Sequence, residues 1–390
     1  MTGGDGTAVT VREQVTLAGY TTLGVGGPAA RFLEAVRDDQ VVAAVRAADA
    51  AGEPVLVLGG GSNLVVADEG FPGTVVHVAT RGVQVSDDDG GGAVVAVAAG
   101  EDWDPLVRRC VAEGLSGLEC LSGIPGLAGA TPIQNVGAYG QEVAETIVSV
   151  RAYDRLRDAV VELANAECGF GYRTSAFKRS ADAGRGAAAP AGGRPARGAA
   201  MNPAAATGRF VVLGVTFRLA AGELSAPVRY AELAKSLGVG EGERVPLADA
   251  RAAVLTLRRG KGMVLDPADP DSRSAGSFFT NPVLDPGQLA DVERRAEARS
   301  GRPVSVPRYP APDGQVKISA AWLIDQAGFG KGYPGTGPAR ISSKHTLALT
   351  NQGGADTASL IGLAREIRDG VRQAFGVDLV NEPVLVGTQL

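Results

Sequence analysis

Hydrophobic residues near the start of the chain follow first a helical and then a strand pattern. After two aspartates that can cap a helix, Val41, Val42 and Val45 fall on one helical face. The apolar run PVLVLGG at residues 54–60 predicts a buried strand that ends in glycine. With the extended segment 21–36 before them, these elements predict a βαβ-like unit.

Strands of alternating polarity follow, and helices dominate the last third of the chain. The segments 83–88 and 93–100 predict strands, residues 103–114 predict a helix, and a glycine-rich stretch then runs to residue 140. In the last third, which we expect to be an α+β unit, apolar residues repeat at helical spacing at Leu360, Leu363, Ile367, Val371 and Phe375.

Residues 179–208 consist almost entirely of Ala, Gly, Pro and Arg. They lack the periodic apolar residues that offset the entropy of ordering, so we expect a flexible surface insertion. GFGYRTSAFK at 169–178 suggests a strand and its exit, and FVVLGVTFRLAAG at 210–222 suggests a second strand. The insertion is then a loop between neighbouring strands. We expect its deletion to leave turnover intact.

Composition excludes several classes of function. In 390 residues, 45% are hydrophobic and 21% charged, and the net charge of −5 offers no basic face for a nucleic acid. No apolar run approaches the roughly 20 residues that span a bilayer, and the N-terminus lacks a signal sequence, so we expect a cytoplasmic protein without membrane insertion. Three cysteines, expected in the core, and two histidines argue against a disulfide framework, a metal site or a histidine-based hydrolase.

The basic residues carry a further signal, because only six of the 38 are lysine. An ammonium is a compact point charge that can sit against phosphate or carboxylate, so a retained lysine is a candidate for a chemical role. Chance retention at the surface explains any single one equally well. The six are Lys178, Lys235, Lys261, Lys317, Lys331 and Lys344.

Two glycine-rich segments suggest a nucleotide cofactor. GGGSN at 59–63 follows a strand and can aim backbone N–H groups at a diphosphate, although alone it is equally typical of a tight turn. The long segment 117–143 carries almost no charge, which suits backbone wrapped around a large aromatic ring system. The residues expected to hold the cofactor are Gly59, Gly60, Gly61, Ser62, Asn63, Gly123, Ile124, Pro125, Gly126, Ala130, Gln134, Asn135, Gly137 and Ala138.

Two shorter segments are ambiguous when each is considered alone. Arg173 could bind a carboxylate or lie over a ring, or it could simply pair with a surface acid. In SAGSFFTNP, Ser277 lies between a glycine and two phenylalanines, which could form a dry wall beside a ligand. A strand end whose serine only caps the backbone is the simpler reading of that stretch.

Seven motifs in order resemble the UDP-N-acetylenolpyruvoylglucosamine reductase family, the subclass with a substrate-covering tyrosine loop. They are GGGSNL, GIPGLAGATPIQNVGAYGQE, GYRTSAFK, AGSFFTNP, KISAAWLIDQAGFGKG, SSKHTLALTN and LVNEPVLVG, and the resemblance spans about residues 18–388. It implies an α+β fold with a two-part FAD-binding domain of the vanillyl-alcohol-oxidase type and a C-terminal α+β substrate domain. The implied domains are 1–80, 81–224 and 225–390.

The resemblance also implies a reaction and three catalytic residues. NADPH would reduce FAD, and hydride from the flavin would reach C3 of the enolpyruvyl group of a UDP-sugar, giving UDP-N-acetylmuramate for peptidoglycan. Ser277 would donate the proton to C2, because a serine acting as an acid needs no histidine base. Arg173 matches the arginine that stabilises the enolate, and Glu382 matches the catalytic carboxylate.

The substrate-binding residues follow from the same resemblance. They are Tyr172, Tyr230, Lys261, Asn281, Tyr309 and Lys317, with Tyr230 closing over the diphosphate. Two departures stand out, the insertion at 179–208 and Val384, where the family often has arginine. The expected partners are the UDP-sugar and NADPH, bound by a monomer.

Two other functions remain open from the residues alone. The same FAD fold could serve an alcohol or hydroxy-acid oxidase, although such chemistry usually needs a base that this chain offers in only two histidines. A non-catalytic flavoprotein would show damage at Arg173, Ser277 or Glu382, and none is seen.

Overall fold

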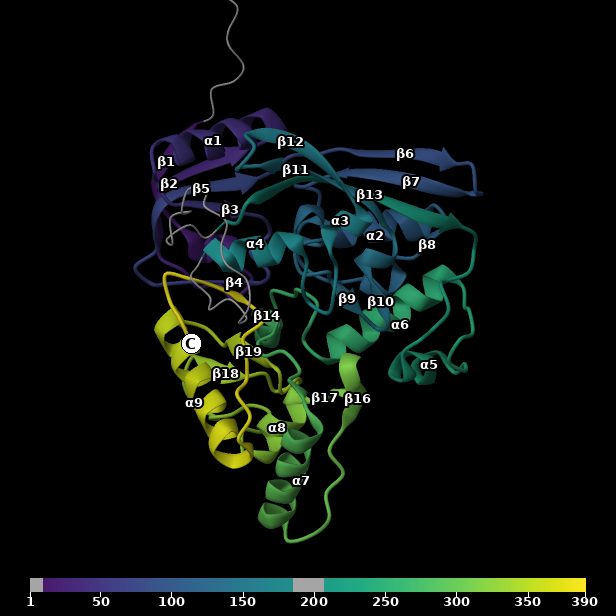
Figure 1. Cartoon of the computed structure of the whole chain (residues 1–390), viewed down its shortest axis with the longest axis vertical. Helices are drawn as coiled ribbons and strands as arrows, with labels where there is room; N and C mark the ends of the chain where they lie inside the picture. The colour runs from purple at the N-terminus through teal and green to yellow at the C-terminus, as the bar shows by residue number, and fades with distance from the viewer. Residues whose placement is uncertain (1–9, 185–206) are drawn as a thin grey trace, which may run out of the picture. The chain divides into compact units, whose positions relative to one another are not determined.

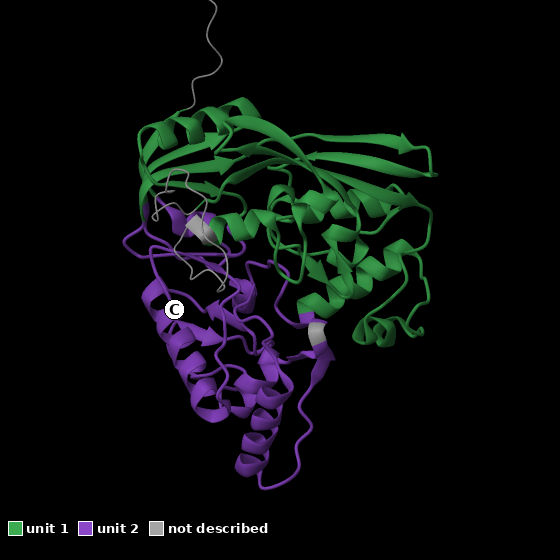
Figure 2. Cartoon of the chain, in the orientation of Figure 1, with its two compact units in different colours: residues 1–15, 29–60, 71–259 green, residues 16–28, 61–70, 260–390 purple. Residues whose placement is uncertain are grey.

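The computed structural model describes residues 10–184 and 207–390, which fall into two compact units (Figure 2). Unit 1 comprises residues 1–15, 29–60 and 71–259, and unit 2 comprises residues 16–28, 61–70 and 260–390. The chain therefore passes between the units several times. The division at 1–80, 81–224 and 225–390 concerns which ligand each part binds, and it stays a prediction.

The described part of unit 1 contains two large sheets and one two-stranded sheet (Figure 1). The first has the order β1-β2-β5-β3, with β2 and β3 both parallel to β5, and α1 connects β2 to β3. The predicted βαβ-like unit is confirmed, with β5 inserted between its two strands. These elements are β1 (Val11–Thr16), β2 (Pro28–Ala35), α1 (Asp38–Ala50), β3 (Val55–Leu58) and β5 (Phe71–Val78).

The second sheet of unit 1 is antiparallel, in the order β12-β11-β13-β7-β6, with β8 paired to β13. Its strands are β6 (Val83–Asp88), β7 (Gly92–Ala98), β8 (Leu115–Ser116), β11 (Ile147–Asp154), β12 (Ala159–Ala164) and β13 (Phe210–Ala221). A short hairpin, β9 (Gly137–Ala138) with β10 (Gln141–Glu142), closes the glycine-rich stretch. The other helices of unit 1 are α2 (Trp103–Ala112), α3 (Asn165–Cys168), α4 (Ala176–Gly184), α5 (Ala231–Leu237) and α6 (Leu247–Gly260).

The largest core of unit 1 joins both sheets to α1 and α2. The predicted helical face of α1 is buried, and Trp103 and Val107 of α2 pack into the same cluster as Val95 and Val97 of β7. All three cysteines are buried, as the sequence predicted, and none of them forms a disulfide.

Unit 2 is organised around one long amphipathic helix, α9 (Thr357–Phe375), which contacts α7, α8, β18 and β19. The five apolar positions predicted for this helix are all buried. Asp356 caps its start by accepting a hydrogen bond from the Ser359 N–H (2.9 Å). The remaining elements are β4 (Leu64–Val66), β14 (Ser274–Ser277), β15 (Val283–Leu284), α7 (Pro286–Ser300), β16 (Arg308–Pro310), β17 (Val316–Ile318), α8 (Ala320–Gln326), β18 (Ala339–Ile341), β19 (Ala348–Asn351) and β20 (Val384–Val386).

Two sequence-based expectations around the insertion are wrong. Residues 169–178 form no strand: after α3, residues 171–174 make a tight turn closed by a bridge between Gly171 and Thr174, and α4 begins at Ala176. The helix runs to Gly184, because Phe177 is buried against Phe210 of β13 and anchors it. Residues 179–184 are therefore helical, and 185–206 lie outside the described residues.

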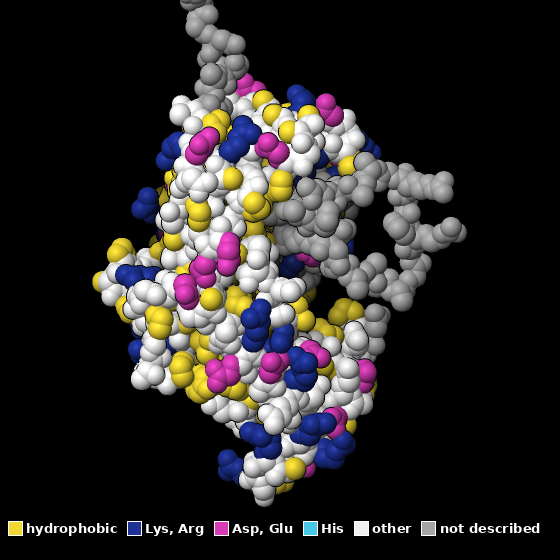
Figure 3. All heavy atoms as spheres, turned by 90° about the vertical axis from the view of Figure 1, so that its left-hand side faces the viewer, with side chains coloured by type: hydrophobic (Ala, Val, Ile, Leu, Met, Phe, Trp, Pro, Cys, Tyr) yellow, Lys and Arg dark blue, Asp and Glu magenta, His cyan; other side chains and the backbone are white. Residues whose placement is uncertain are grey.

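The surface carries mixed charge where it is described. On the face drawn in Figure 3, basic side chains are interspersed with acidic ones. Across residues 10–184 and 207–390, no helix is long and apolar enough to cross a membrane.

Candidate active site

The first glycine loop follows β3, as predicted, and leaves no room for side chains at two positions. A Cβ on Gly60 would lie 2.7 Å from the Gly126 Cα, so the backbones at Gly60 and Gly126, both in unit 1, are in contact. Gly61 has φ +57°, and a Cβ there would lie 1.9 Å from the Tyr20 carbonyl oxygen. No hydrogen bond among the described residues uses the N–H groups of residues 59–62, so these donors can face an anion.

The second glycine-rich segment is tied to two helices through Asp104. The Gly123 N–H donates to Asp104 Oδ1 (2.6 Å), and Arg251 of α6 donates to both carboxylate oxygens (2.7 and 2.9 Å). Burial alone raises the pKa of this carboxyl, but the bonds from Arg251 and Gly123 outweigh burial and lower its pKa below the ordinary value. The ion pair thereby fixes the start of this segment.

Asn135 supports the same segment from within. It has φ +45° and is almost fully buried, and its Nδ2 donates to Glu142 Oε2 (2.7 Å) and the Gly171 carbonyl (3.1 Å). Its Oδ1 accepts from the Ala144 N–H (3.1 Å). The side chain of Asn135 is therefore engaged with the Glu142 carboxylate and with backbone groups of Gly171 and Ala144.

Arg173 lies on the turn before α4 and reaches back to this segment. Its Nη2 donates to the Gly137 carbonyl (2.8 Å), and its guanidinium carbon lies 5.7 Å from the centre of the Tyr172 ring. The residue itself has φ +51°, and the Lys178 ammonium donates to its carbonyl (3.1 Å). Arg173 and the predicted cofactor residues 135–137 are thus brought together.

Ser277 is the last residue of β14 in unit 2. It pairs with Ala348 after a register shift at Gly276, which has φ +75°. Its hydroxyl is half-buried and makes no hydrogen bond within residues 10–184 and 207–390. The next two residues, Phe278 and Phe279, are each 1% exposed and pack edge to face at 5.2 Å. The two phenylalanines are buried directly after Ser277, as a dry wall requires, and their role beside a ligand stays a prediction.

Glu382, near the C-terminus, bonds the backbone just after strand β14. Its N–H donates to the Phe278 carbonyl (2.9 Å), the residue directly after Ser277. Asn63 joins them, because its Nδ2 donates to the Glu382 carbonyl (3.4 Å) and its own carbonyl accepts from the Val384 N–H (2.9 Å). Three predicted site residues, distant in sequence, therefore share one backbone network.

The predicted substrate residues fall into separate groups. Tyr309 of β16 and Lys317 of β17 are register partners, with the Lys317 ammonium 6.0 Å from the ring centre. Asn281 accepts from the Ala320 N–H (2.9 Å) at the start of α8. Lys261 lies in the turn that follows α6. In unit 1, Tyr230 precedes α5 and packs edge to face on Tyr139 at 5.5 Å.

Comparisons with known proteins agree across the chain. The profile of an FAD binding domain matches residues 12–163, and that of the C-terminal domain of UDP-N-acetylenolpyruvoylglucosamine reductase matches residues 267–386. The protein named UDP-N-acetylenolpyruvoylglucosamine reductase from Thermobifida fusca (strain YX) is 57% identical over 97% of this chain and 98% of its own length. The chain belongs to this reductase family. A relative of the same name from Streptomyces coelicolor is 55% identical over 96% of this chain and 90% of its own length.

A solved structure supports the same family assignment. The crystal structure of UDP-N-acetylenolpyruvylglucosamine reductase (MurB) from Thermus caldophilus matches 97% of this chain and 99% of its own, with a TM-score of 0.57 and 25% identity. FAD is the cofactor, and the residues of this family member fit it. The backbone N–H groups of residues 59–62, which make no hydrogen bond within the described residues, suit its diphosphate. The segment 123–138, which has no charged side chain, suits a ring system.

Sequence reasoning missed the residues that support the second glycine-rich segment and Tyr230. Asp104 and Arg251 are 147 positions apart, and nothing in the local sequence distinguishes them from other charged residues on helices. Tyr139, which packs against Tyr230, carries no signal in the sequence beyond its place in the glycine-rich motif. Its φ of +49° places it in the tight turn between β9 and β10.

Proposed function

We propose that the chain is an FAD- and NADPH-dependent oxidoreductase that reduces the enolpyruvyl ether of a UDP-N-acetylglucosamine derivative to UDP-N-acetylmuramate, a peptidoglycan precursor. Family membership over nearly the full length supports the reaction. The observation that supports the mechanism is the Ser277 hydroxyl, which makes no hydrogen bond within the described part of the chain and is followed by two buried phenylalanines. Bound FAD would supply hydride chemistry, taking hydride from NADPH and delivering it to C3 of the enolpyruvyl group.

Three residues of the chain complete the chemistry. Ser277 donates its hydroxyl proton to C2, so that the carbon–carbon double bond gains one hydride and one proton, and solvent then reprotonates the serine. Phe278 and Phe279 exclude water from this step. Arg173 stabilises the developing enolate, and Glu382 positions the intermediate.

Binding roles divide between glycine segments and polar side chains. We assign the diphosphate of FAD to residues 59–63 and its ring system to 123–138. Tyr172, Tyr230, Lys261, Asn281, Tyr309 and Lys317 meet the UDP-sugar, because most of these side chains can bond phosphate or sugar oxygens. The one reassignment that the contacts suggest concerns Asn135, whose side chain supports the cofactor backbone rather than the cofactor.

We also propose that the enzyme acts as a monomer in the cytoplasm, without a nucleic-acid or membrane partner. The net charge of −5 supports the absence of a nucleic-acid partner. Light scattering on the purified holoenzyme tests the oligomeric state.

The flavin spectrum under anaerobic conditions tests the reaction itself. We expect NADPH to bleach the flavin and the enolpyruvyl UDP-sugar to restore it. A bound flavin that the sugar cannot reoxidise would instead favour an alcohol or hydroxy-acid oxidase. Failure to bind flavin under any loading condition would contradict the assignment of both glycine segments.

A further inference from the structure

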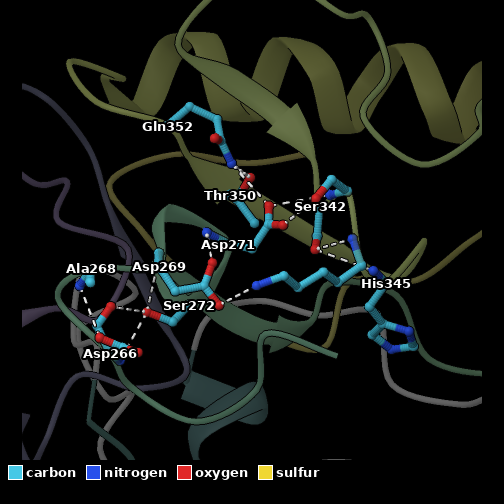
Figure 4. A network of polar contacts seen from close by, with 11 residues as sticks. Asp266, Ala268, Asp269, Asp271, Ser272, Ser342, His345, Thr350 and Gln352 are labelled. Carbon is cyan, nitrogen blue, oxygen red and sulfur yellow. Dashed lines mark hydrogen bonds and ion pairs between the residues drawn. The ribbon is translucent and has the colours of Figure 1, made fainter. Parts of the chain in front are cut away.

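Asp271 is a buried carboxylate that the reaction leaves unexplained. It is 5% exposed and lies in a short 3-10 turn, three residues before β14 begins. Its Oδ1 accepts from the Ser343 N–H (3.2 Å) and from Gln352 Nε2 (3.1 Å), and its Oδ2 accepts from the Ser343 hydroxyl (2.5 Å). Figure 4 shows this carboxylate between the Gln352 side chain and the turn at Ser342. All three of these hydrogen bonds come from uncharged donors, so they fix the position of the groups around Asp271 more than they neutralise its charge.

The partners of Asp271 belong to one hairpin. Ser343 comes just after β18 and Gln352 just after β19, and the two strands are antiparallel neighbours. Gln352 Nε2 also donates to Thr350 Oγ1 (2.8 Å). One carboxylate therefore holds the hairpin at its turn and at its far end.

The same hairpin forms the backbone support of Ser277. Strand β19 pairs with β14 at Ser274 and Ser277, and the register shifts between these two points. Beyond the strand, the Phe278 N–H donates to the Leu347 carbonyl (2.7 Å) in the turn that Asp271 grips through Ser343. Because the register shift leaves β14 without regular pairing, the position of Ser277 depends on where the hairpin is held.

An outer ion pair offers a contrast within the same network. The Lys344 ammonium donates to Asp269 Oδ2 (2.6 Å), with side chains 38% and 19% exposed. Such exposed pairs contribute little to stability or rigidity. Asp269 Oδ1 also accepts from the Asp271 N–H (3.1 Å) and so caps the turn that carries Asp271. Asp269→Asn keeps an oxygen for this cap and removes the charge of the ion pair, so it is the matched control for Asp271.

We propose that Asp271 is a positioning residue for Ser277, holding the β18–β19 hairpin so that the serine hydroxyl lies where it can protonate C2. This inference rests on the proposed function of Ser277. Misplacement of a reacting group by about 1 Å can cost on the order of 100-fold in rate, so loss of Asp271 slows the proton-transfer step selectively. Reduction of the flavin by NADPH does not use Ser277 and is left unchanged.

Stopped-flow spectroscopy of the two half-reactions tests the proposal in the flavin-loaded full chain. We expect Asp271→Ala to slow reoxidation by the enolpyruvyl UDP-sugar roughly 10- to 100-fold and to raise its solvent deuterium isotope effect, while reduction by NADPH stays within about twofold. Asp271→Asn restores the parent rate, because its oxygen accepts from the Ser343 N–H and Gln352 while its amide donates to the Ser343 hydroxyl. Asp269→Asn, which keeps the cap on the Asp271 N–H and removes only the charge opposite Lys344, leaves both rates unchanged.

Equal slowing of both half-reactions in Asp271→Ala, or no slowing of reoxidation, overturns the proposal. If Asp271→Ala does not retain flavin, Ser343→Ala decides, since it removes one of the three bonds and must slow reoxidation while sparing reduction. Ser277→Ala is measured in parallel. If the flavin of Ser277→Ala is reoxidised at the parent rate, the proposed role of Ser277 is wrong. If reoxidation is slow in Ser277→Ala but normal in Asp271→Ala, only the inference about Asp271 is rejected.

Discussion

Gly60 leaves no space for a side chain, and this gives a sharp prediction for cofactor binding. A Cβ at this position would meet the Gly126 Cα at 2.7 Å, so Gly60→Ala must push the backbones at residues 60 and 126 of unit 1 apart. We expect the purified variant to contain less than about a tenth of the parent's FAD, because shifted N–H donors no longer converge on the diphosphate. Flavin absorbance relative to protein absorbance measures the loss.

A glycine in open space is the control for that substitution. Gly362 is exposed on α9, and a Cβ there would meet no atom within 4 Å. Gly362→Ala should keep the parent flavin content and stabilise the protein by up to about 1 kcal/mol, since alanine favours helix. Normal flavin content in Gly60→Ala would contradict the close packing of the two segments.

Because of Asp104, we expect the stability of the protein to depend on pH in the acid range. Its pKa is lowered in the folded protein because the bonds from Arg251 and Gly123 outweigh burial. Its contribution to stability is therefore present above the ordinary aspartate pKa of about 3.9 and is lost as the pH falls through the lower folded value. Below about pH 4, we expect the free energy of unfolding of Asp104→Asn to fall less steeply than that of the parent.

Urea unfolding between about pH 3 and pH 7 measures this difference. The control is Asp87→Asn, because Asp87 is exposed on β6 and makes no ion pair or side-chain hydrogen bond among the described residues. Its pH profile should match the parent's. Identical profiles for Asp104→Asn and the parent would show that the carboxylate does not anchor Gly123.

At the scale of elements, periodic segments were predictable and the insertion boundaries were not. Helix α9 and strand β13 can be predicted from the sequence because their apolar residues recur at positions that are buried. Helix α4 was missed because its second half is Ala- and Gly-rich, so only contact between Phe177 and Phe210, 33 positions later, reveals it. For the proposed site, motifs predict Ser277 and Glu382, whereas Asp271 and Asp104 bond partners far away in sequence, which local sequence cannot identify.

The corrected boundaries change the prediction for deleting the insertion. The end of the segment is structural, since Thr207 Oγ1 accepts from the Val57 N–H (2.7 Å) in β3, directly before the first glycine loop. Gly208 packs against the backbone of Ala181 in α4. We therefore expect replacement of 185–206 by a short Gly-Ser linker to preserve flavin content and turnover, whereas deletion of 179–208 loses flavin.

The two variants control for each other when the same Gly-Ser linker joins the ends in both. Both then lack residues 185–206, and only the longer one also lacks 179–184, Thr207 and Gly208. Flavin content and steady-state turnover of both proteins give the comparison. Loss of flavin in the shorter deletion would assign a role to residues 185–206. Retention of flavin in the longer one would show that α4 and Thr207 do not support β3.

At the scale of the whole molecule, the three cysteines report on unit 1 alone. Cys110, Cys120 and Cys168 all belong to unit 1, and unit 2 contains no cysteine. Burial is the main cause that raises the thiol pKa to about 12 for Cys110 and Cys120 and to about 11 for Cys168. A thiol reagent at pH 8 can therefore react only when unit 1 opens.

If FAD binds the folded form of unit 1, it should slow this reaction by mass action. At a free FAD concentration 100 times its dissociation constant, the opened population falls about 100-fold, and the labelling rate should fall with it when reclosing outpaces labelling. The absorbance of the released thiol reagent measures the labelling rate in flavin-free and flavin-loaded protein. Urea-unfolded protein, in which all three cysteines should label at once, gives the maximum labelling rate. A rate that is indifferent to FAD would mean that the cofactor does not stabilise unit 1, and both glycine segments would then need another role.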